Sequence, residues 1–267
     1  MATQTKVKYS VSVKIFRLSF SVNCSMKAYT VLVSFCLILA CTKKTDQFMI
    51  KDNSTPQTMP NVTTGTALTY LALGDSYTIG EAVSEKESFP FQLAAQLRVG
   101  DLNVSTPKIV AKTGWTTSEL QAAIKTENLT TNYDVVTLLI GVNNQYRGES
   151  QTQYKKEFVE LLNTAIAFAK GNKKHVFVVS IPDWGVTPFG KASGKGAQTI
   201  AKEIDAFNAI NKDETLAMGV SYTEITLASR NAATDVTLVA TDGLHPSGKM
   251  YADWAQKVAL AAIPILK

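Results

Sequence analysis

Between residues 67 and 267, short apolar runs alternate with longer amphipathic stretches, and this alternation most constrains the fold. The runs are rich in β-branched and aliphatic residues, as buried parallel strands are, and they lie at 68–73, 108–111, 135–140, 176–181 and 220–225. Their starts are 27 to 44 residues apart, which leaves room for a crossover helix each time. We therefore expect a single three-layer α/β/α domain with a mostly parallel five-stranded sheet.

The stretches between the runs carry apolar residues at helical spacing. This spacing predicts helices over 89–97, 154–170 and 199–218. Pro90 falls in the first turn of the first helix, and Gly171 follows the second as a stop signal. Ser247 is expected to cap a last helix. The chain shows no internal repeat.

The positive charge of the chain is concentrated near its N-terminus. The formal net charge is +5, from 27 Lys and Arg against 22 Asp and Glu. Residues 1–40 hold five of the basic residues and no acidic one, so the rest of the chain is close to neutral. A neutral body argues against a nucleic-acid partner. At 45% hydrophobic and 18% charged residues, the composition is that of a globular protein.

The segment before the domain is typical of an export signal. Residues 28–40 are almost wholly apolar, too few for a membrane-spanning helix but suited to a signal-peptide core, and Lys27 precedes them. The run ends Ile38-Leu39-Ala40-Cys41. This ending resembles a bacterial lipoprotein signal, in which the cysteine becomes the lipidated first residue. A plain signal peptide with a chance cysteine, or a core strand, are the alternatives.

The expected organisation has three parts. Residues 1–40 form the lipoprotein signal peptide, of which 1–25 are either a mis-assigned upstream extension before Met26 or a long basic region. Residues 41–66 hold the lipidated Cys41 and a polar tether, and residues 67–267 form the domain. The cysteines are Cys24, Cys36 and Cys41, so the mature chain keeps only the anchor and has no disulfide framework. The expected location is the cell envelope, with the chain anchored by lipid.

Polar and glycine-containing loops follow the predicted strands. In open parallel sheets ligands bind at the carboxyl ends of the strands, so these loops are expected to meet at one edge. A serine, a loop glycine, an asparagine and an Asp/His pair form the set that acyl transfer needs. In chain order the loops carry Gly74-Asp75-Ser76, Lys112-Thr113-Gly114-Trp115, Gly141-Val142-Asn143-Asn144, Pro182-Asp183-Trp184-Gly185 and Asp242-Gly243-Leu244-His245.

From Gly74 to His245 these blocks resemble the SGNH, or GDSL-type, serine hydrolase superfamily, in the family's order. The resemblance implies a flavodoxin-like hydrolase fold and cofactor-free cleavage of carboxylic esters. In that reading Ser76 is the nucleophile, His245 the general base and Asp242 the residue that orients the imidazole. Each motif alone also fits a structural role: a helix-capping serine, a surface histidine, an Asp-Gly turn.

The resemblance also implies an oxyanion hole formed by the backbone N–H groups of Ser76 and Gly114 and the side-chain amide of Asn143. One departure is Asn144, which stands where the family usually has aspartate; this puts a supporting contact in doubt and leaves the oxyanion donor in place. Tyr77 replaces the leucine of the short family name, at a position expected to tolerate change.

Residues of the same loops are candidates for substrate binding. Aromatic side chains there can hold an acyl chain, an aryl group or a sugar face, and Arg147 can meet a phosphate or carboxylate. The alternative is that Trp184 covers the core and Arg147 is solvated. The candidate residues are Trp115, Asn144, Tyr146, Arg147 and Trp184. The substrate is expected among lysophospholipids, thioesters, aryl esters and acetylated glycans.

No metal site or cofactor is expected, because the only two histidines, His175 and His245, are far apart and no phosphate-binding loop pattern occurs. The partners expected are an ester substrate and, through the lipid anchor, the membrane; the domain is expected to be monomeric. Two other functions fit the same residues. One is an acyltransferase on the same site, and the other is a non-catalytic glycan- or lipid-binding lipoprotein.

Overall fold

The computed structural model describes residues 66–129 and 132–267, and within them five strands form one parallel sheet. The strand order is β2-β1-β3-β4-β5, the flavodoxin-like arrangement, and every neighbouring pair is parallel. The strands are β1 (Tyr70–Gly74), β2 (Lys108–Ala111), β3 (Val135–Leu139), β4 (Val176–Val179) and β5 (Ser221–Thr223). The predicted fold class is confirmed.

The last strand is shorter than the apolar run 220–225 predicts. The backbone N–H groups of Ile225 and Thr226 donate to the hydroxyl of Ser180, at 2.8 and 3.2 Å, instead of to a strand. A side chain therefore takes the hydrogen bonds that would have extended the ladder.

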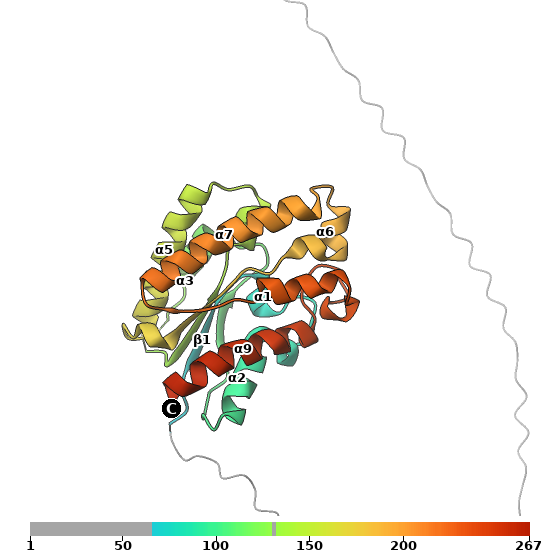
Figure 1. Ribbon diagram of the computed structural model, residues 1–267. Helices are drawn as coiled ribbons and strands as arrows, with labels where there is room; N and C mark the ends of the chain where they lie inside the picture. The colour runs from blue at the N-terminus through green and yellow to red at the C-terminus, as the bar shows by residue number, and fades with distance from the viewer. Residues whose placement is uncertain (1–65, 130–131) are drawn as a thin grey trace, which may run out of the picture. The chain divides into compact units, whose positions relative to one another are not determined.

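Helices cover both faces of the sheet (Figure 1). The helices α2 and α9 pack together on one face, and α3, α5 and α7 on the other. The longer helices are α2 (Phe89–Val99), α3 (Thr117–Thr126), α5 (Gln151–Phe168), α7 (Ala197–Ala217) and α9 (Gly248–Leu266). The short ones are α1 (Ser76–Ile79), α4 (Val142–Tyr146), α6 (Pro188–Ala192) and α8 (Thr226–Ser229). Five 3-10 turns complete the described chain: η1 (Glu85–Glu87), η2 (Lys173–His175), η3 (Trp184–Val186), η4 (Arg230–Ala233) and η5 (Val236–Leu238).

The helix ends follow local sequence signals. Ser247 caps α9, accepting from the Met250 N–H as expected. Helix α3 is not among the predicted helices, although it begins with a capping box. There the Thr116 side chain accepts from the Glu119 N–H, and the Glu119 carboxylate accepts from the Thr116 N–H at 2.8 Å.

The register brings the carboxyl ends of the central strands together. Gly74, the last residue of β1, pairs with Ala111 of β2 and Leu139 of β3. A Cβ atom at this position would clash with the Thr78 hydroxyl and the Leu139 carbonyl oxygen, so the serine turn that follows requires glycine here. His175 lies at the start of β4, at the opposite edge of the sheet, as expected.

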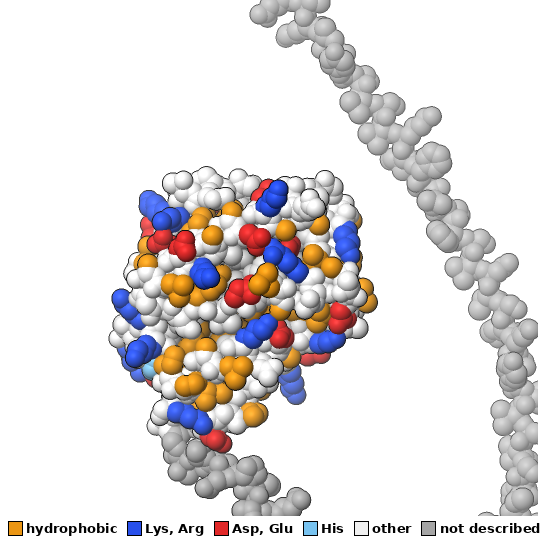
Figure 2. All heavy atoms as spheres, viewed as in Figure 1, with side chains coloured by type: hydrophobic (Ala, Val, Ile, Leu, Met, Phe, Trp, Pro, Cys, Tyr) orange, Lys and Arg blue, Asp and Glu red, His pale blue; other side chains and the backbone are white. Residues whose placement is uncertain are grey.

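On the face seen in Figure 2, side chains of both charges are interspersed and no continuous basic patch is visible. No helix within residues 66–129 and 132–267 has the length and apolar character to cross a membrane. The predicted signal peptide, Cys41 and the tether up to residue 65 lie outside the described residues.

Candidate active site

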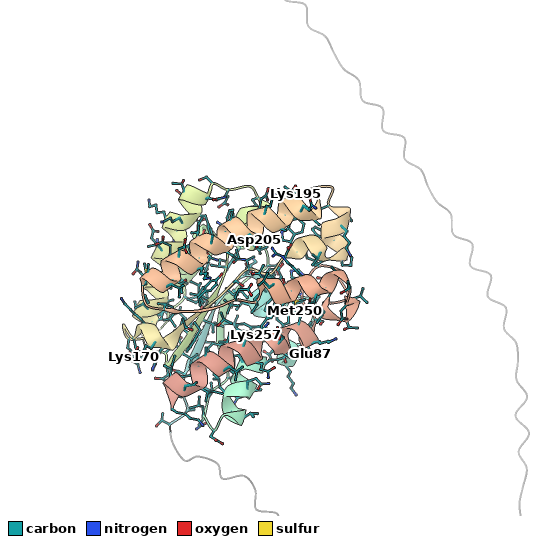
Figure 3. All side chains as sticks on the ribbon, viewed as in Figure 1. Glu87, Lys170, Lys195, Asp205, Met250 and Lys257 are labelled. Carbon is teal, nitrogen blue, oxygen red and sulfur yellow. The ribbon has the colours of Figure 1, made fainter. Side chains whose placement is uncertain are left out.

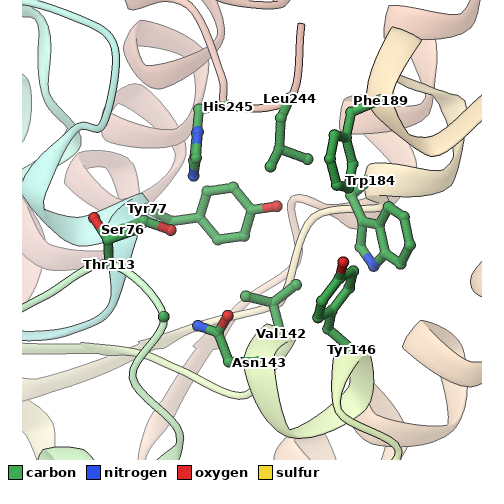
Figure 4. A pocket seen from close by; sticks show the side chains of 11 residues that line it. Ser76, Tyr77, Thr113, Val142, Asn143, Tyr146, Trp184, Phe189, Leu244 and His245 are labelled. Carbon is green, nitrogen blue, oxygen red and sulfur yellow. The ribbon is translucent and has the colours of Figure 1, made fainter. Parts of the chain in front are cut away.

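A pocket of about 220 Å³ opens at the carboxyl edge of the sheet (Figure 4). It brings together Ser76, Gly114, Asn143 and His245, which four different segments of the chain contribute. In Figure 4 Ser76, Asn143 and His245 lie on one side of the Tyr77 ring, and the aromatic side chains of Tyr146, Trp184 and Phe189 lie on the other. The remaining lining residues are Tyr77, Thr113, Val142, Tyr146, Trp184, Phe189 and Leu244.

Ser76 is the first residue of α1 and lies directly beyond β1. Asp75 caps this one-turn helix by accepting the Tyr77 N–H at 3.0 Å, and Gly80 ends it in the left-handed conformation. The Asp75 carboxyl is fully buried and its second oxygen has no hydrogen-bond partner among the described residues. Its burial outweighs the hydrogen bond from Tyr77 and raises its pKa to about 7. The turn thus presents Ser76 to the pocket on a rigid support.

Asp242 and His245 form a bonded pair on the loop before α9. Nδ1 of His245 lies 2.5 Å from Oδ2 of Asp242, whose Oδ1 accepts the N–H groups of Leu244 at 2.9 Å and His245 at 3.0 Å. Partial burial of Asp242 acts to raise its pKa, but these hydrogen bonds outweigh it and lower the pKa. A charged carboxylate on Nδ1 leaves Nε2 as the nitrogen free to accept a proton.

The imidazole of His245 is almost buried, and Tyr77 packs against it edge-on, with ring centroids 5.7 Å apart. The Tyr77 ring also meets Trp254 of α9. Burial, with the nearby charges of Asp75, Asp183 and Asp242, raises the pKa of Tyr77, so this phenol stays neutral. Tyr77 therefore supports the ring of the predicted base, a role that its place after Ser76 did not suggest.

Across the pocket from His245 lie the two further predicted oxyanion donors, Gly114 and Asn143. Gly114 has a φ of 85°, a left-handed conformation that favours glycine. Asn143 lies in α4, and its Nδ2 donates to the carbonyl of Trp115 at 2.9 Å. Because that nitrogen carries two hydrogens, one bond to Trp115 fixes the amide and leaves the other hydrogen for a ligand.

Three aromatic side chains form the outer part of the pocket: Tyr146, Trp184 and Phe189 (Figure 4). Trp184 contacts Tyr146 at a centroid distance of 5.4 Å and Phe189 at 6.0 Å. Its indole N–H donates to Oε1 of Gln145 at 2.8 Å, and the Gln145 amide donates to Glu203 of α7 at 2.5 Å. The indole is therefore held in place by a chain of two hydrogen bonds, the first of them buried.

The loop that carries Trp184 is anchored by an arginine. Arg230 pairs with the buried Asp183 at 2.9 Å and with Asp205 at 2.7 Å, and Figure 3 labels Asp205 on α7. Asp183 also caps η3 by accepting the Gly185 N–H. These contacts give Asp183 a structural role.

The structure does not bring Trp115, Asn144 and Arg147 to the pocket, although all three were predicted as substrate contacts. Trp115 packs against the core. Asn144 is fully buried: its Oδ1 accepts the Thr117 N–H at 3.1 Å, and its Nδ2 donates to the Thr117 hydroxyl and to Glu149, both at 2.7 Å. Asparagine can donate to Glu149 where an ionised aspartate could not.

Arg147 also turns away from the pocket, toward the loop that precedes α3. Its Nη2 donates to the Gly114 carbonyl at 2.6 Å and its Nη1 pairs with Glu119 at 3.2 Å. The structure therefore gives Arg147 protein partners in place of a substrate phosphate or carboxylate.

Five of the pocket residues were not predicted as site residues of any kind: Tyr77, Thr113, Val142, Phe189 and Leu244. Four of them are neighbours in sequence of predicted site residues, which was the available signal. Phe189 had none, because the start of α6 folds back over the pocket. Within the described part of the chain no cluster of three or more His, Cys, Asp or Glu could hold a metal ion.

The parallel sheet in the order β2-β1-β3-β4-β5, with a serine turn after β1 and an Asp-His pair before the last helix, defines an α/β protein with a hydrolase-like pocket. Residues 72–252 match the model of the GDSL-like lipase/acylhydrolase family. The chain belongs to this family and is a carboxylic ester hydrolase.

Solved structures share the fold at low sequence identity. A lipase from a goat rumen metagenome has a TM-score of 0.61 at 20% identity, covering 75% of this chain and 100% of its own. A lipase/acylhydrolase from Enterococcus faecalis has a TM-score of 0.58 at 18% identity, and the match covers 75% of this chain and 97% of that one. An acetylxylan esterase from Geobacillus stearothermophilus has a TM-score of 0.57 at 15% identity, and the match covers 74% of this chain and 95% of that one. No curated protein matches the chain significantly.

Proposed function

We propose that this protein hydrolyses carboxylic esters through an acyl intermediate on Ser76. The observation that carries the proposal is the convergence of Ser76, His245, Gly114 and Asn143 on one pocket, with Asp242 bonded to the imidazole. These are the nucleophile, base, oxyanion donors and orienting carboxylate that acyl transfer requires.

In the first step His245 takes the proton of the Ser76 hydroxyl at Nε2 while Oγ attacks the ester carbonyl carbon. The N–H groups of Ser76 and Gly114 and the Asn143 amide donate to the oxyanion that forms. The imidazolium returns its proton to the leaving alcohol as the C–O bond breaks. A water molecule, deprotonated by His245, then attacks the acyl-enzyme and releases the acid and free Ser76.

The proposed substrates are neutral esters with a short acyl or small aryl group. No Lys or Arg is among the described residues that line the pocket, so an anionic headgroup has no partner there. Its volume of about 220 Å³ is below the roughly 300–1,000 Å³ of pockets for drug-sized ligands. Aryl and acetyl esters fit this space better than long-chain lipids. The proposed setting is the cell envelope, with Cys41 as the lipid anchor.

The test uses purified residues 42–267 and p-nitrophenyl esters from acetyl to long acyl chains, beside Ser76→Ala and with EDTA present. We expect turnover that Ser76→Ala and His245→Ala abolish without unfolding, and an optimum at short chains. Full activity in Ser76→Ala would refute the nucleophile. A folded protein that neither turns over any ester nor reacts with a fluorophosphonate would indicate a binding protein. Formation of an acylated acceptor product would indicate an acyltransferase.

A further inference from the structure

The loop of residues 112–116, here named the oxyanion loop, is held from both sides. It carries Gly114 and connects β2 to α3. On one side the Thr113 hydroxyl donates to the carboxylate of Glu81, whose own N–H donates to the Ser76 carbonyl at 3.1 Å. The oxyanion loop is therefore tied to the turn that carries the proposed nucleophile.

On the other side α4 and the residue that follows it supply the contacts. Asn143 donates to the Trp115 carbonyl, and Arg147, the residue that ends α4, donates from Nη2 to the Gly114 carbonyl at 2.6 Å. Within the described part of the chain no other group donates to that carbonyl. Arg147 also pairs through Nη1 with Glu119, which accepts the Thr116 N–H. One guanidinium thus connects the middle of the oxyanion loop to the start of α3.

These bonds constrain the direction of the Gly114 N–H. Each peptide unit is planar, so a bond to the Gly114 carbonyl fixes the plane between Gly114 and Trp115. The bond from the Thr113 hydroxyl to Glu81 restrains the preceding plane, between Thr113 and Gly114, which carries the Gly114 N–H. At a φ of 85° glycine has wide conformational freedom. Among the described residues, the plane between Gly114 and Trp115 is otherwise held only by the longer bond from the Trp115 N–H to the Lys112 carbonyl, at 3.2 Å. Loss of the Arg147 bond therefore removes the shorter of its two restraints.

We propose that Arg147 is a positioning residue of the oxyanion hole, acting through its bond to the Gly114 carbonyl. The inference rests on the proposed serine mechanism. Arginine suits the task because its planar, permanently charged fork reaches a carbonyl and a carboxylate at once. The side chains of Arg147 and Glu119 are 45% and 42% exposed, so the ion pair itself contributes little to stability. Losing the Gly114 bond should therefore affect catalysis more than folding.

The experiment compares Arg147→Met with Arg147→Lys in the full chain, with kcat and KM measured on p-nitrophenyl acetate and melting followed by circular dichroism. Methionine keeps the unbranched stem and removes every donor; lysine keeps one charged donor. Removing an oxyanion donor outright costs roughly a hundred- to a thousandfold in kcat, so misplacing one is expected to cost about tenfold. KM and the melting temperature should change little, and Arg147→Lys should recover part of the loss.

The matched control is Arg98→Met. Arg98 also holds loop carbonyls, those of Val104 at 2.9 Å and Ser105 at 3.2 Å, but before β2, at the opposite edge of the sheet. Its kcat should equal that of the wild type. An equal loss of kcat in both methionine variants would overturn the proposal, because general loosening would then explain both.

Ser76→Ala in the same assay separates this inference from the proposed function. Wild-type kcat in Arg147→Met beside an inactive Ser76→Ala overturns the positioning role and leaves the serine mechanism standing. A rise in KM at unchanged kcat also overturns it, since Arg147 would then bind substrate. Turnover that survives in Ser76→Ala overturns both. If Arg147→Met fails to fold, Arg147→Ala, which also removes every donor, replaces it, and wild-type kcat in that folded variant refutes the role.

Discussion

Both oxygens of the Asp242 carboxylate are directed at His245: Oδ2 lies 2.5 Å from the ring Nδ1, and Oδ1 accepts the backbone N–H of the same residue at 3.0 Å. One carboxylate therefore fixes the ring and the backbone that carries it. The spacing of three residues makes this possible on a tight turn, and it leaves Nε2 of the imidazole toward the pocket that holds Ser76.

Asp242→Asn should lower kcat by a factor on the order of 10² to 10⁴ and leave the protein folded. The amide oxygen can still accept the backbone N–H groups, but its nitrogen would face Nδ1 as a donor and favour the wrong imidazole tautomer. Steady-state kinetics with a melting curve checks this. Activity equal to the wild type would show that the carboxylate does not orient the base.

Asn143→Ala should reduce kcat about a hundred- to a thousandfold with little change in KM, because in the proposed mechanism its amide donates to the oxyanion and not to the ground-state ester. Asn143→Asp is the matched variant, since it keeps the size and loses the donor. The two variants should lose similar activity on p-nitrophenyl acetate. An equal rise in KM at constant kcat would instead assign Asn143 to substrate binding.

Asp75→Asn should remove part of the pH dependence of stability. The folded-state pKa of Asp75, about 7, lies above the ordinary value of 3.8, so the unfolded chain releases this proton first as the pH rises. This group's stabilisation is complete below pH 4, falls between pH 4 and 7, and is lost above that, a difference of about 4 kcal/mol.

The measurement is the free energy of unfolding by urea at pH 4, 6 and 8. The amide oxygen of Asp75→Asn can still accept the Tyr77 N–H, so the helix cap is kept. The free energy of unfolding of the variant should increase relative to that of the wild type as the pH rises from 4 to 8. Parallel pH profiles for the two proteins would show that Asp75 ionises normally in the folded state.

Phe189→Ala should shift the acyl-chain preference toward longer esters. Phe189 is 40% exposed and packs on Trp184 at the outer wall, so its removal opens the pocket at little cost in stability. Each additional methylene of the acyl chain that becomes buried in the pocket contributes about 0.8 kcal/mol, which corresponds to a roughly fourfold increase in kcat/KM. The kcat/KM ratio of octanoyl to acetyl ester measures this. Leu260→Ala, at an exposed site on α9, is the control, and a ratio unchanged from it would contradict the prediction.

The sheet and the location of the site could be predicted from the sequence, because buried parallel strands are apolar runs and their carboxyl ends share one edge. The directions of the loop side chains could not. Residues 142–146 form a helical turn, so Val142, Asn143 and Tyr146 line the pocket, whereas Asn144 bonds to Thr117 at the start of α3 and Arg147 bonds to Gly114 and Glu119. A strand followed by a loop carries no periodicity that would separate these two faces.

Ser76 belongs to the first strand-to-helix turn, whereas Asp242 and His245 immediately precede α9, which packs against α2. Synthesis proceeds from the N-terminus, so the proposed nucleophile emerges from the ribosome long before its proposed base. A nascent chain thus carries an ordinary, unreactive serine hydroxyl. Under the proposed mechanism, ester cleavage begins only when the last helix has docked, so turnover that depends on Ser76 reports on chains that were completed and folded.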